Sequence, residues 1–288
     1  MPTLLDFRRR IRSVKSTQQV TRAMKFVSAA RLRRAQERAI EARPYSAEIT
    51  KLVRSAAARM ENPQHPLLAR REEKKILLLV ATGDRGLAGA FNANAVRRAI
   101  EFLRSRAQQT TEVIPIGRKG RDAFRRHKWT IAAEYVGFTA RADFEKAREI
   151  GQKVVEMYES TEIDAVYMLF NEFKSVITQR MVFEKLLPID PPDEAEKKAA
   201  SSQVDYIYEQ PPEELLAGLL PRYISARIYR MLADSSAAEH AARMTAMDSA
   251  TNNAGELIDS LTLEMNKIRQ AAITKEIIEV VSGAAWGA

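Results

Sequence analysis

The most regular pattern in the chain is a repeat of small and apolar positions near its C-terminus, spaced alternately four and three residues apart. The repeat runs through Ala233, Ala237, His240, Met244, Met247, Thr251, Ala254, Ile258, Leu261, Met265, Ile268 and Ala272. Its mean spacing of about 3.5 residues is that of a left-handed coiled coil. No proline follows Pro221, so the pattern predicts one long helix to the end of the chain.

The N-terminal segment repeats the same alternation. Its positions are Ile11, Val14, Gln18, Thr21, Lys25, Ser28, Leu32, Ala35, Ala39 and Ala42, and neither proline nor glycine occurs between Pro2 and Pro44. Small and polar residues occupy seam positions that are Leu or Ile in a stable coiled coil. This predicts a narrow interface in which the two helices adhere only weakly. Helices at the two ends of one chain would most simply pair antiparallel. A self-contained hairpin that only supports the rest of the chain is the alternative.

Between these helices, short apolar runs alternate with helical patterns. Strands are expected at Ile76–Ala81, Glu112–Ile116, Ile131–Val136, Ile163–Phe170, Ser175–Leu187 and Val204–Tyr208, and helices near Asn92–Ala107, Arg118–His127 and Ala142–Glu159. This alternation predicts a partly parallel sheet covered by helices, with an antiparallel hairpin at one edge. Pro188–Ser202 is typical of an exposed loop, and Pro211 and Pro212 followed by two glutamates mark the start of the second long helix.

The predicted fold class is therefore α/β. A long antiparallel coiled coil of the N- and C-terminal helices is combined with a Rossmann-like α/β middle domain. We expect an N-terminal coiled-coil helix at residues 1–60, the α/β domain at 74–208 and a C-terminal coiled-coil helix at 212–288.

The positive charge is concentrated on the first helix. Residues 1–43 contain twelve basic and three acidic side chains, a net +9 that equals the net charge of the whole chain. This predicts an acidic partner along that helix. A basic coiled-coil protein that binds nucleic acid is the alternative, although a bZIP arm has its basic residues and its seam in succession and not in the same stretch.

A targeting signal, a membrane span or a cysteine site would each be visible as a local pattern, and the sequence shows none of these. No window is apolar enough for a membrane span, and neither a secretory signal nor a transit peptide is expected before the first helix. The absence of cysteine excludes disulfides and thiolate metal sites.

A glycine-rich loop, Gly83–Asn92, follows a predicted strand and precedes a helix, as phosphate-binding loops do. Its G-x-x-G-x-x-G spacing is neither the dinucleotide fingerprint nor a Walker A motif. We interpret the glycines as serving a tight turn, with a nucleotide-binding enzyme as the alternative. The sequence offers no nucleophile-base pair, paired carboxylates or metal cluster, so we expect a non-catalytic chain without a cofactor or a metal.

The end of the second helix, Ala271–Trp286, has apolar residues on nearly every face. Such a helix is normally buried. Lys275, Glu276 and Glu279 prevent it from spanning a membrane. The uninterrupted part of the first helix is too short to cover it, so we expect this end to insert into an apolar sleeve formed by other chains.

Three stretches, Ile11–Gln36, Gly83–Asn92 and Ser236–Trp286, closely resemble the gamma-subunit family of bacterial F-type ATP synthases. The resemblance runs end to end, with ITKEIIEVVSGAA as its signature. It implies a non-catalytic rotor that couples transmembrane proton flow to ATP synthesis or hydrolysis. The implied partners are a ring of three alpha and three beta subunits, the epsilon subunit and the membrane c-ring. The implied location is the cytoplasmic face of the cell membrane, as a peripheral protein.

The resemblance also implies partner-contact residues. Met24 and Lys25 match the position that faces an acidic loop of the beta subunit. Arg269, Gln270, Thr274 and Glu276 match polar positions of the C-terminal helix that are important for coupling. Ile277 and Val281 are expected to add apolar contacts to the alpha and beta subunits.

Overall fold

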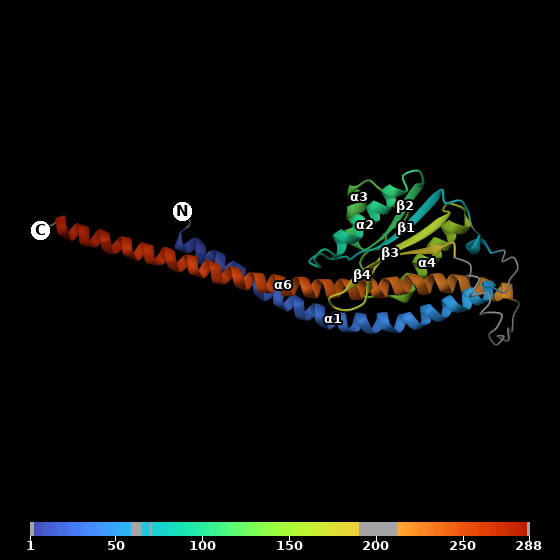
Figure 1. Ribbon diagram of the computed structural model, residues 1–288, viewed down its shortest axis with the longest axis horizontal. Coiled ribbons are helices and arrows are strands. Elements are labelled where there is room, and N and C mark those ends of the chain that lie inside the picture. The colour runs from blue at the N-terminus through green and yellow to red at the C-terminus, as the bar shows by residue number, and fades with distance from the viewer. Residues whose placement is uncertain (1–2, 59–64, 70, 190–211, 287–288) are drawn as a thin grey trace. The chain divides into compact units, whose positions relative to one another are not determined.

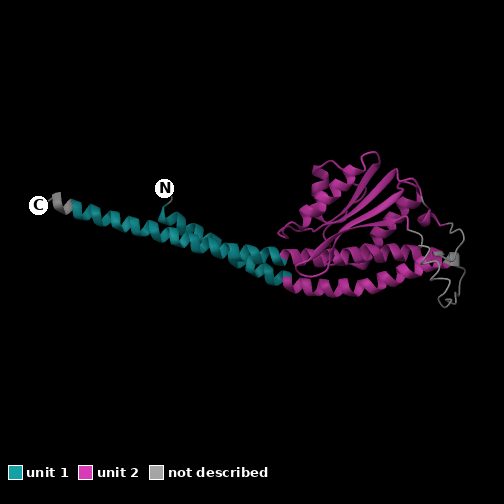
Figure 2. Cartoon of the chain, in the orientation of Figure 1, with its two compact units in different colours: residues 1–28, 244–288 teal, residues 29–243 magenta. Residues whose placement is uncertain are grey.

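The computed structural model describes residues 3–58, 65–69, 71–189 and 212–286 (Figure 1). The chain forms two compact units. We call residues 1–28 and 244–288 the coiled-coil unit and residues 29–243 the sheet unit (Figure 2). Two long helices, α1 (Leu4–Ala58) and α6 (Pro212–Trp286), contribute to both.

In the coiled-coil unit, α1 and α6 pack antiparallel, as predicted. Lys25 lies against Asp248, the hydroxyls of Thr21 and Thr251 are 2.8 Å apart, and Gln18 approaches Gly255. Every predicted seam position of α1 in this unit is buried or half-buried. At the start of α1, Thr3 and Asp6 form a reciprocal cap in which the Thr3 N–H donates to Asp6 Oδ2 at 2.9 Å and the Asp6 N–H donates to Thr3 Oγ1 at 3.3 Å.

The sheet unit contains four strands in the order β2-β1-β3-β4. They are β1 (Lys75–Ala81), β2 (Thr110–Ile116), β3 (Ala165–Phe173) and β4 (Gln179–Leu187). β1 pairs parallel with β2 and with β3, and β4 is antiparallel to β3. The partly parallel sheet with an antiparallel edge hairpin is therefore confirmed.

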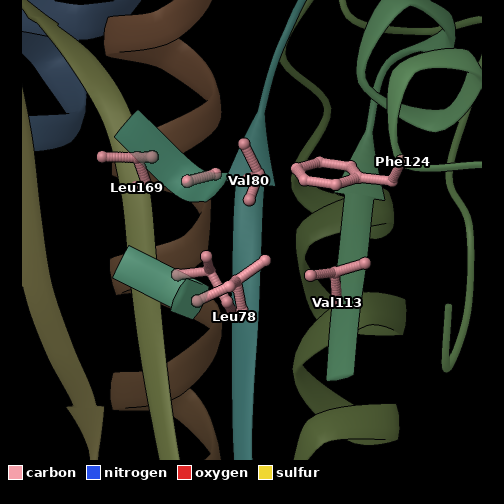
Figure 3. Close-up of a cluster of buried hydrophobic side chains, with 7 residues drawn as sticks. Leu78, Val80, Val113, Phe124 and Leu169 are labelled. Carbon is pink, nitrogen blue, oxygen red and sulfur yellow. The ribbon is translucent and has the colours of Figure 1, made fainter. Parts of the chain in front are cut away.

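Helices cover both faces of this sheet. They are α2 (Phe91–Ser105), α3 (Arg118–Arg126) and α4 (Phe144–Glu159), and a 3-10 turn, η1, spans Pro66–Leu68. α2 and α3 lie on one face, over a core that includes Leu78, Val80 and Phe124 (Figure 3). α4 packs against α6, where Gly151 meets Ser225.

Two details of the sheet differ from the prediction. Ile131–Val136 is not a strand: it lies beside the edge strand β2 but makes only two isolated bridges, at Ile131 and Tyr135. Pro115 of β2 has no N–H to donate, and it falls between Val113 and Gly117, which do donate to this segment. The last predicted strand of the hairpin begins at Gln179 because Ser175–Thr178 form the turn.

The predicted strand Val204–Tyr208, and most of the loop Pro188–Ser202, lie outside the described residues. The second long helix begins at Pro212, next to the proline and glutamate signal.

Candidate functional site

The predicted contact residues of α1 lie at the seam of the coiled-coil unit. Met24 is half-buried, and Lys25 Nζ is 2.6 Å from Asp248 Oδ1. Both side chains of this ion pair are partly exposed, at 37% and 47%. The ammonium group of Lys25 is thus already neutralised within the chain, and an acidic partner would have to share it or displace Asp248.

The predicted contact residues of α6 begin level with the first residue of α1 and continue beyond it. The register that places Gln18 beside Gly255 and Lys25 beside Asp248 brings Leu4, the first residue of α1, level with Arg269. From Ile273 to Ser282 every side chain of α6 is exposed. The first helix therefore does not cover this end, as the sequence predicted; we call residues 270–282 the α6 tip.

The α6 tip presents a continuous face for contact. Gln270, Thr274, Ile277 and Val281 follow one another at spacings of four and three residues, so they line one side of the helix. Ile277 is 57% exposed and Val281 is 63% exposed, with Ile273, Ile278 and Val280 exposed beside them. Arg269 and Glu276 are exposed on the adjacent side. The side chains of residues 283–288, including Trp286, lie outside the description.

A second candidate site lies within the sheet unit. A cavity of about 510 Å³ is bounded by α1, the glycine-rich loop, the start of α3, the segment 137–141 and α6. Its lining includes seven arginines: Arg31, Arg34, Arg38, Arg85, Arg118, Arg141 and Arg243. We call it the arginine cavity. The concentration of charge on α1 did not reveal this convergence, because no local sequence pattern links arginines from five separate segments.

Asp84 fixes one wall of the arginine cavity. Its carboxylate accepts hydrogen bonds from the backbone N–H groups of Arg118, Gly137 and Thr139 and from the Thr139 hydroxyl, at 2.8–3.0 Å. Burial alone would raise the pKa of Asp84, but these hydrogen bonds hold it below the usual value for aspartate. The ionised carboxylate thereby ties the glycine-rich loop to α3 and to the segment 137–141.

Glu239, His240 and Arg243 of α6 form the opposite wall. The carboxylate of Glu239 accepts a hydrogen bond from Arg243 Nη2 at 2.5 Å, and burial raises the pKa of Glu239 although Arg243 opposes the shift. Arg243 also donates to the carbonyl of Gly86. Burial lowers the pKa of His240, so this imidazole is neutral at pH 7, and its Nε2 lies 3.2 Å from the carbonyl of Ala140.

The backbone of the glycine-rich loop is already occupied. The N–H of Gly83 donates to Asn92 Oδ1 and the N–H of Asp84 donates to Thr139 Oγ1. In the first turn of α3, Lys119 N–H donates to the carbonyl of Gly83 and Gly120 N–H donates to Thr82 Oγ1. The loop therefore forms a tight turn, as interpreted, and it does not present these N–H groups to a phosphate.

The described residues offer neither a metal cluster nor a membrane-spanning helix. Within these residues no group of three or more His, Cys, Asp or Glu side chains is placed to hold a metal ion. None of the described helices is long and apolar enough to cross a membrane.

The chain was compared with known proteins. Residues 3–285 match the family model described as ATP synthase. The chain is 52% identical to the ATP synthase gamma chain of Solibacter usitatus, over 99% of both chains. It is 48% identical to that of Pelotomaculum thermopropionicum, again over 99% of both.

Solved structures share the fold. The chain resembles a chain of the Euglena gracilis mitochondrial ATP synthase, with a TM-score of 0.70 at 17% identity over 98% of this chain and 93% of that one. It also resembles a chain of the central stalk and c-ring structure of the Tetrahymena thermophila enzyme, with a TM-score of 0.63 at 24% identity over 80% of this chain and 99% of that one.

These matches run the full length of the chain and include both long helices and the sheet. They confirm the resemblance found in the sequence, and they decide between a rotor subunit and the two alternatives, a nucleic-acid-binding protein and a nucleotide-binding enzyme. The chain belongs to the gamma-chain family of ATP synthases, the non-catalytic rotor subunits of the central stalk.

Proposed function

We propose that the α6 tip inserts into a ring of three alpha and three beta subunits and turns there as the shaft of the complex. One observation carries the proposal: Ile273, Ile277 and Val281 are 48–63% exposed on a helix end that α1 does not reach. Contiguous exposed apolar surface of this kind is typical of a contact site. The sleeve would be formed by alpha and beta chains, with Arg269, Gln270, Thr274 and Glu276 as polar contacts.

An asymmetric shaft explains how three identical catalytic sites can differ at one moment. Each site adopts the state that its own contact with the shaft favours, and turning the shaft exchanges the states. A partner that binds and releases in rotation needs contacts without strong anchors. The exposed basic side chains of α1, among them Arg8, Arg12 and Arg22, suit weak contacts with acidic loops of the beta subunit, next to Met24 and Lys25.

We assign the remaining contacts of the rotor to the epsilon subunit and the membrane c-ring. The Tetrahymena structure with the same fold contains a central stalk and a c-ring, which supports this assignment. Proton flow through the c-ring would drive rotation in one direction and ATP hydrolysis in the other. The chain would then work at the cytoplasmic face of the cell membrane, as a peripheral protein.

Truncation of the chain after Ala272 tests the proposal. In the reconstituted complex we expect proton-driven ATP synthesis to fall several-fold or more, while the sheet unit stays folded. The double variant Ile277→Ser/Val281→Ser should act in the same direction with a smaller effect. Ile177→Ser is a matched control, because Ile177 is 90% exposed in the hairpin of the sheet unit. Unchanged ATP synthesis after the truncation would refute the sleeve contact.

A further inference from the structure

Most arginines of the arginine cavity have no carboxylate partner. Within the described residues, the side chains of Arg31, Arg34, Arg38, Arg118 and Arg141 form no ion pair. Arg33, on the same turn of α1 as Arg34 but outside the cavity, pairs with Glu37 at 3.5 Å. Ion pairing therefore differs even within one turn of α1, and at the cavity three arginines of α1 converge with arginines from four other segments.

The cavity has a large positive charge. Seven guanidinium groups face two carboxylates, Asp84 and Glu239, which gives a net charge of +5 when both are ionised and His240 is neutral. Asp84 is saturated by hydrogen-bond donors from the surrounding loops, and Glu239 is held by Arg243. Neither carboxylate is available to the other arginines, so their mutual repulsion is reduced only by solvent and salt, and an anion from outside would find several uncompensated guanidinium groups.

His240 provides a second, independent observation. The residue is 1% exposed, and its Nδ1 has no hydrogen-bond partner. Its Nε2 is committed to the carbonyl of Ala140. A buried polar atom without a partner is rare in proteins and commonly marks a place for a ligand or water. Because Nε2 must carry a proton to bond the Ala140 carbonyl, Nδ1 is a donor only in the imidazolium form. An adjacent anion favours that form, and the protonated Nδ1 would then donate to it.

The lining also indicates the kind of anion. Guanidinium groups bind phosphate oxygens in a two-pronged geometry, and a volume of about 510 Å³ falls within the range of small-molecule sites. Among the described residues no Phe, Tyr or Trp lines the cavity, so a nucleotide base would find no large aromatic ring to stack on. An extended acidic polypeptide carries one charge per side chain, whereas a di- or triphosphate delivers several charges within a few ångströms.

We propose that the arginine cavity binds a multivalent phosphate anion, either an inorganic di- or triphosphate or the phosphate tail of a nucleotide, through its guanidinium groups and without recognition of the base. The site goes beyond the rotor function, because all of its residues lie in the sheet unit and none belongs to the α6 tip. An anion bound here would lower the positive charge that α1 and the glycine-rich loop offer to acidic partners.

Calorimetric titration of the full-length chain tests the proposal, with inorganic tripolyphosphate and ATP as separate probes. We expect saturable binding of both, with affinities within about threefold of each other because the base is not read. The double variant Arg34→Gln/Arg141→Gln should weaken binding at least about tenfold, as expected for the loss of charge-assisted hydrogen bonds. Both side chains are exposed, so the fold should be retained.

The matched control is Arg33→Gln/Arg97→Gln, which removes the same charge from exposed arginines outside the cavity. It should change the affinity less than about twofold. NMR titration of His240 should show its pKa rising when tripolyphosphate is bound, since an adjacent anion favours the imidazolium. Equal weakening in both double variants would mean non-specific attraction to a basic chain and would overturn the proposal.

Two other outcomes would also overturn it. Binding of ATP without binding of tripolyphosphate would mean that the base is recognised. A hexaglutamate peptide that binds at the same arginines more tightly than tripolyphosphate would assign the cavity to an acidic polypeptide segment.

Discussion

The same helix, α6, has opposite surroundings in the two units. From Met231 to Ala241, in the sheet unit, every residue is buried, and even the charged ones have partners, such as Arg43 for Asp234 at 2.7 Å. From Ile273 to Ser282, in the coiled-coil unit, every residue is exposed although several are strongly apolar. The sheet unit thus buries its own apolar groups, whereas the end of the coiled-coil unit leaves its apolar groups exposed.

The largest expected effect on stability separates a buried residue of the sheet unit from an exposed residue of the α6 tip. Phe124 is fully buried in the cluster under α2 and α3. Phe124→Ala should therefore lower the unfolding free energy by about 3–5 kcal/mol. Ile277→Ala should leave the unfolding free energy nearly unchanged, because Ile277 is 57% exposed. Urea unfolding followed by circular dichroism measures both. A comparable loss in the two variants would mean that the α6 tip is packed within the chain.

The next effect concerns the hydrogen-bonded carboxylate of Asp84. Asp84→Asn should lower the unfolding free energy by about 1.5–3 kcal/mol at pH 7, because hydrogen bonds to a charged acceptor are lost. The pKa of Asp84 is depressed in the folded chain, so its stabilisation is complete above the unfolded-state pKa of about 3.9 and is lost as the pH falls through the folded-state pKa.

The difference between wild type and Asp84→Asn should therefore be constant near neutral pH and shrink below about pH 4. Unfolding curves measured from pH 3 to pH 7 would show this. A difference that does not depend on pH would mean that the charge of Asp84 contributes nothing.

A smaller effect is expected where the glycine-rich loop meets α6. A Cβ atom on Gly83 would lie 2.7 Å from the Glu239 carboxyl carbon, whereas the nearest neighbour of a Cβ on Gly86 is Lys119 Cε at 3.6 Å. Because Glu239 is buried and held by Arg243, it cannot move away freely. Gly83→Ala should destabilise the chain by about 1–3 kcal/mol, as overpacking does. Gly86→Ala is the matched control, and thermal unfolding of both compares them.

The smallest effect is expected at the seam of the coiled-coil unit. Lys25→Gln removes a partly exposed ion pair with Asp248 and should cost about 0–1 kcal/mol. Raising the salt concentration should further reduce the difference in unfolding free energy between the wild type and Lys25→Gln. Urea unfolding at low and at high salt measures both effects, and a loss well above this range would show that the seam is held by strong anchors.

The sequence predicted the elements whose patterns are local. The alternation at Thr21, Ser28 and Ala35 marks positions that are buried in α1, and the apolar run that became β1 was placed within one residue. Pro44 does not end the first helix, because α1 continues to Ala58. Both Pro44 and Ile40 are exposed, so water can hydrate the carbonyl that loses its donor, while Ile49 and Val53 continue the buried seam.

Features that depend on distant segments could not be predicted. The isolated bridges of Ile131 and Tyr135 depend on Pro115 in the neighbouring strand. The arginine cavity depends on the approach of α1, α3 and α6, and no spacing in the sequence records that approach. The positions of Met24 and Thr274 came from the family resemblance and not from a pattern of charge or hydropathy.

The small side chains of the seam have a mechanical consequence. Deep knobs that interlock resist the sliding of one helix along another, but Ala254, Gly255 and Thr21 offer almost none. Resistance to axial shear in this stretch then rests mainly on directional bonds: the Thr21 and Thr251 hydroxyls at 2.8 Å and the Lys25–Asp248 pair at 2.6 Å. Pulling the two helices lengthwise past each other would break these few polar contacts first. Little steric resistance would then remain in this stretch.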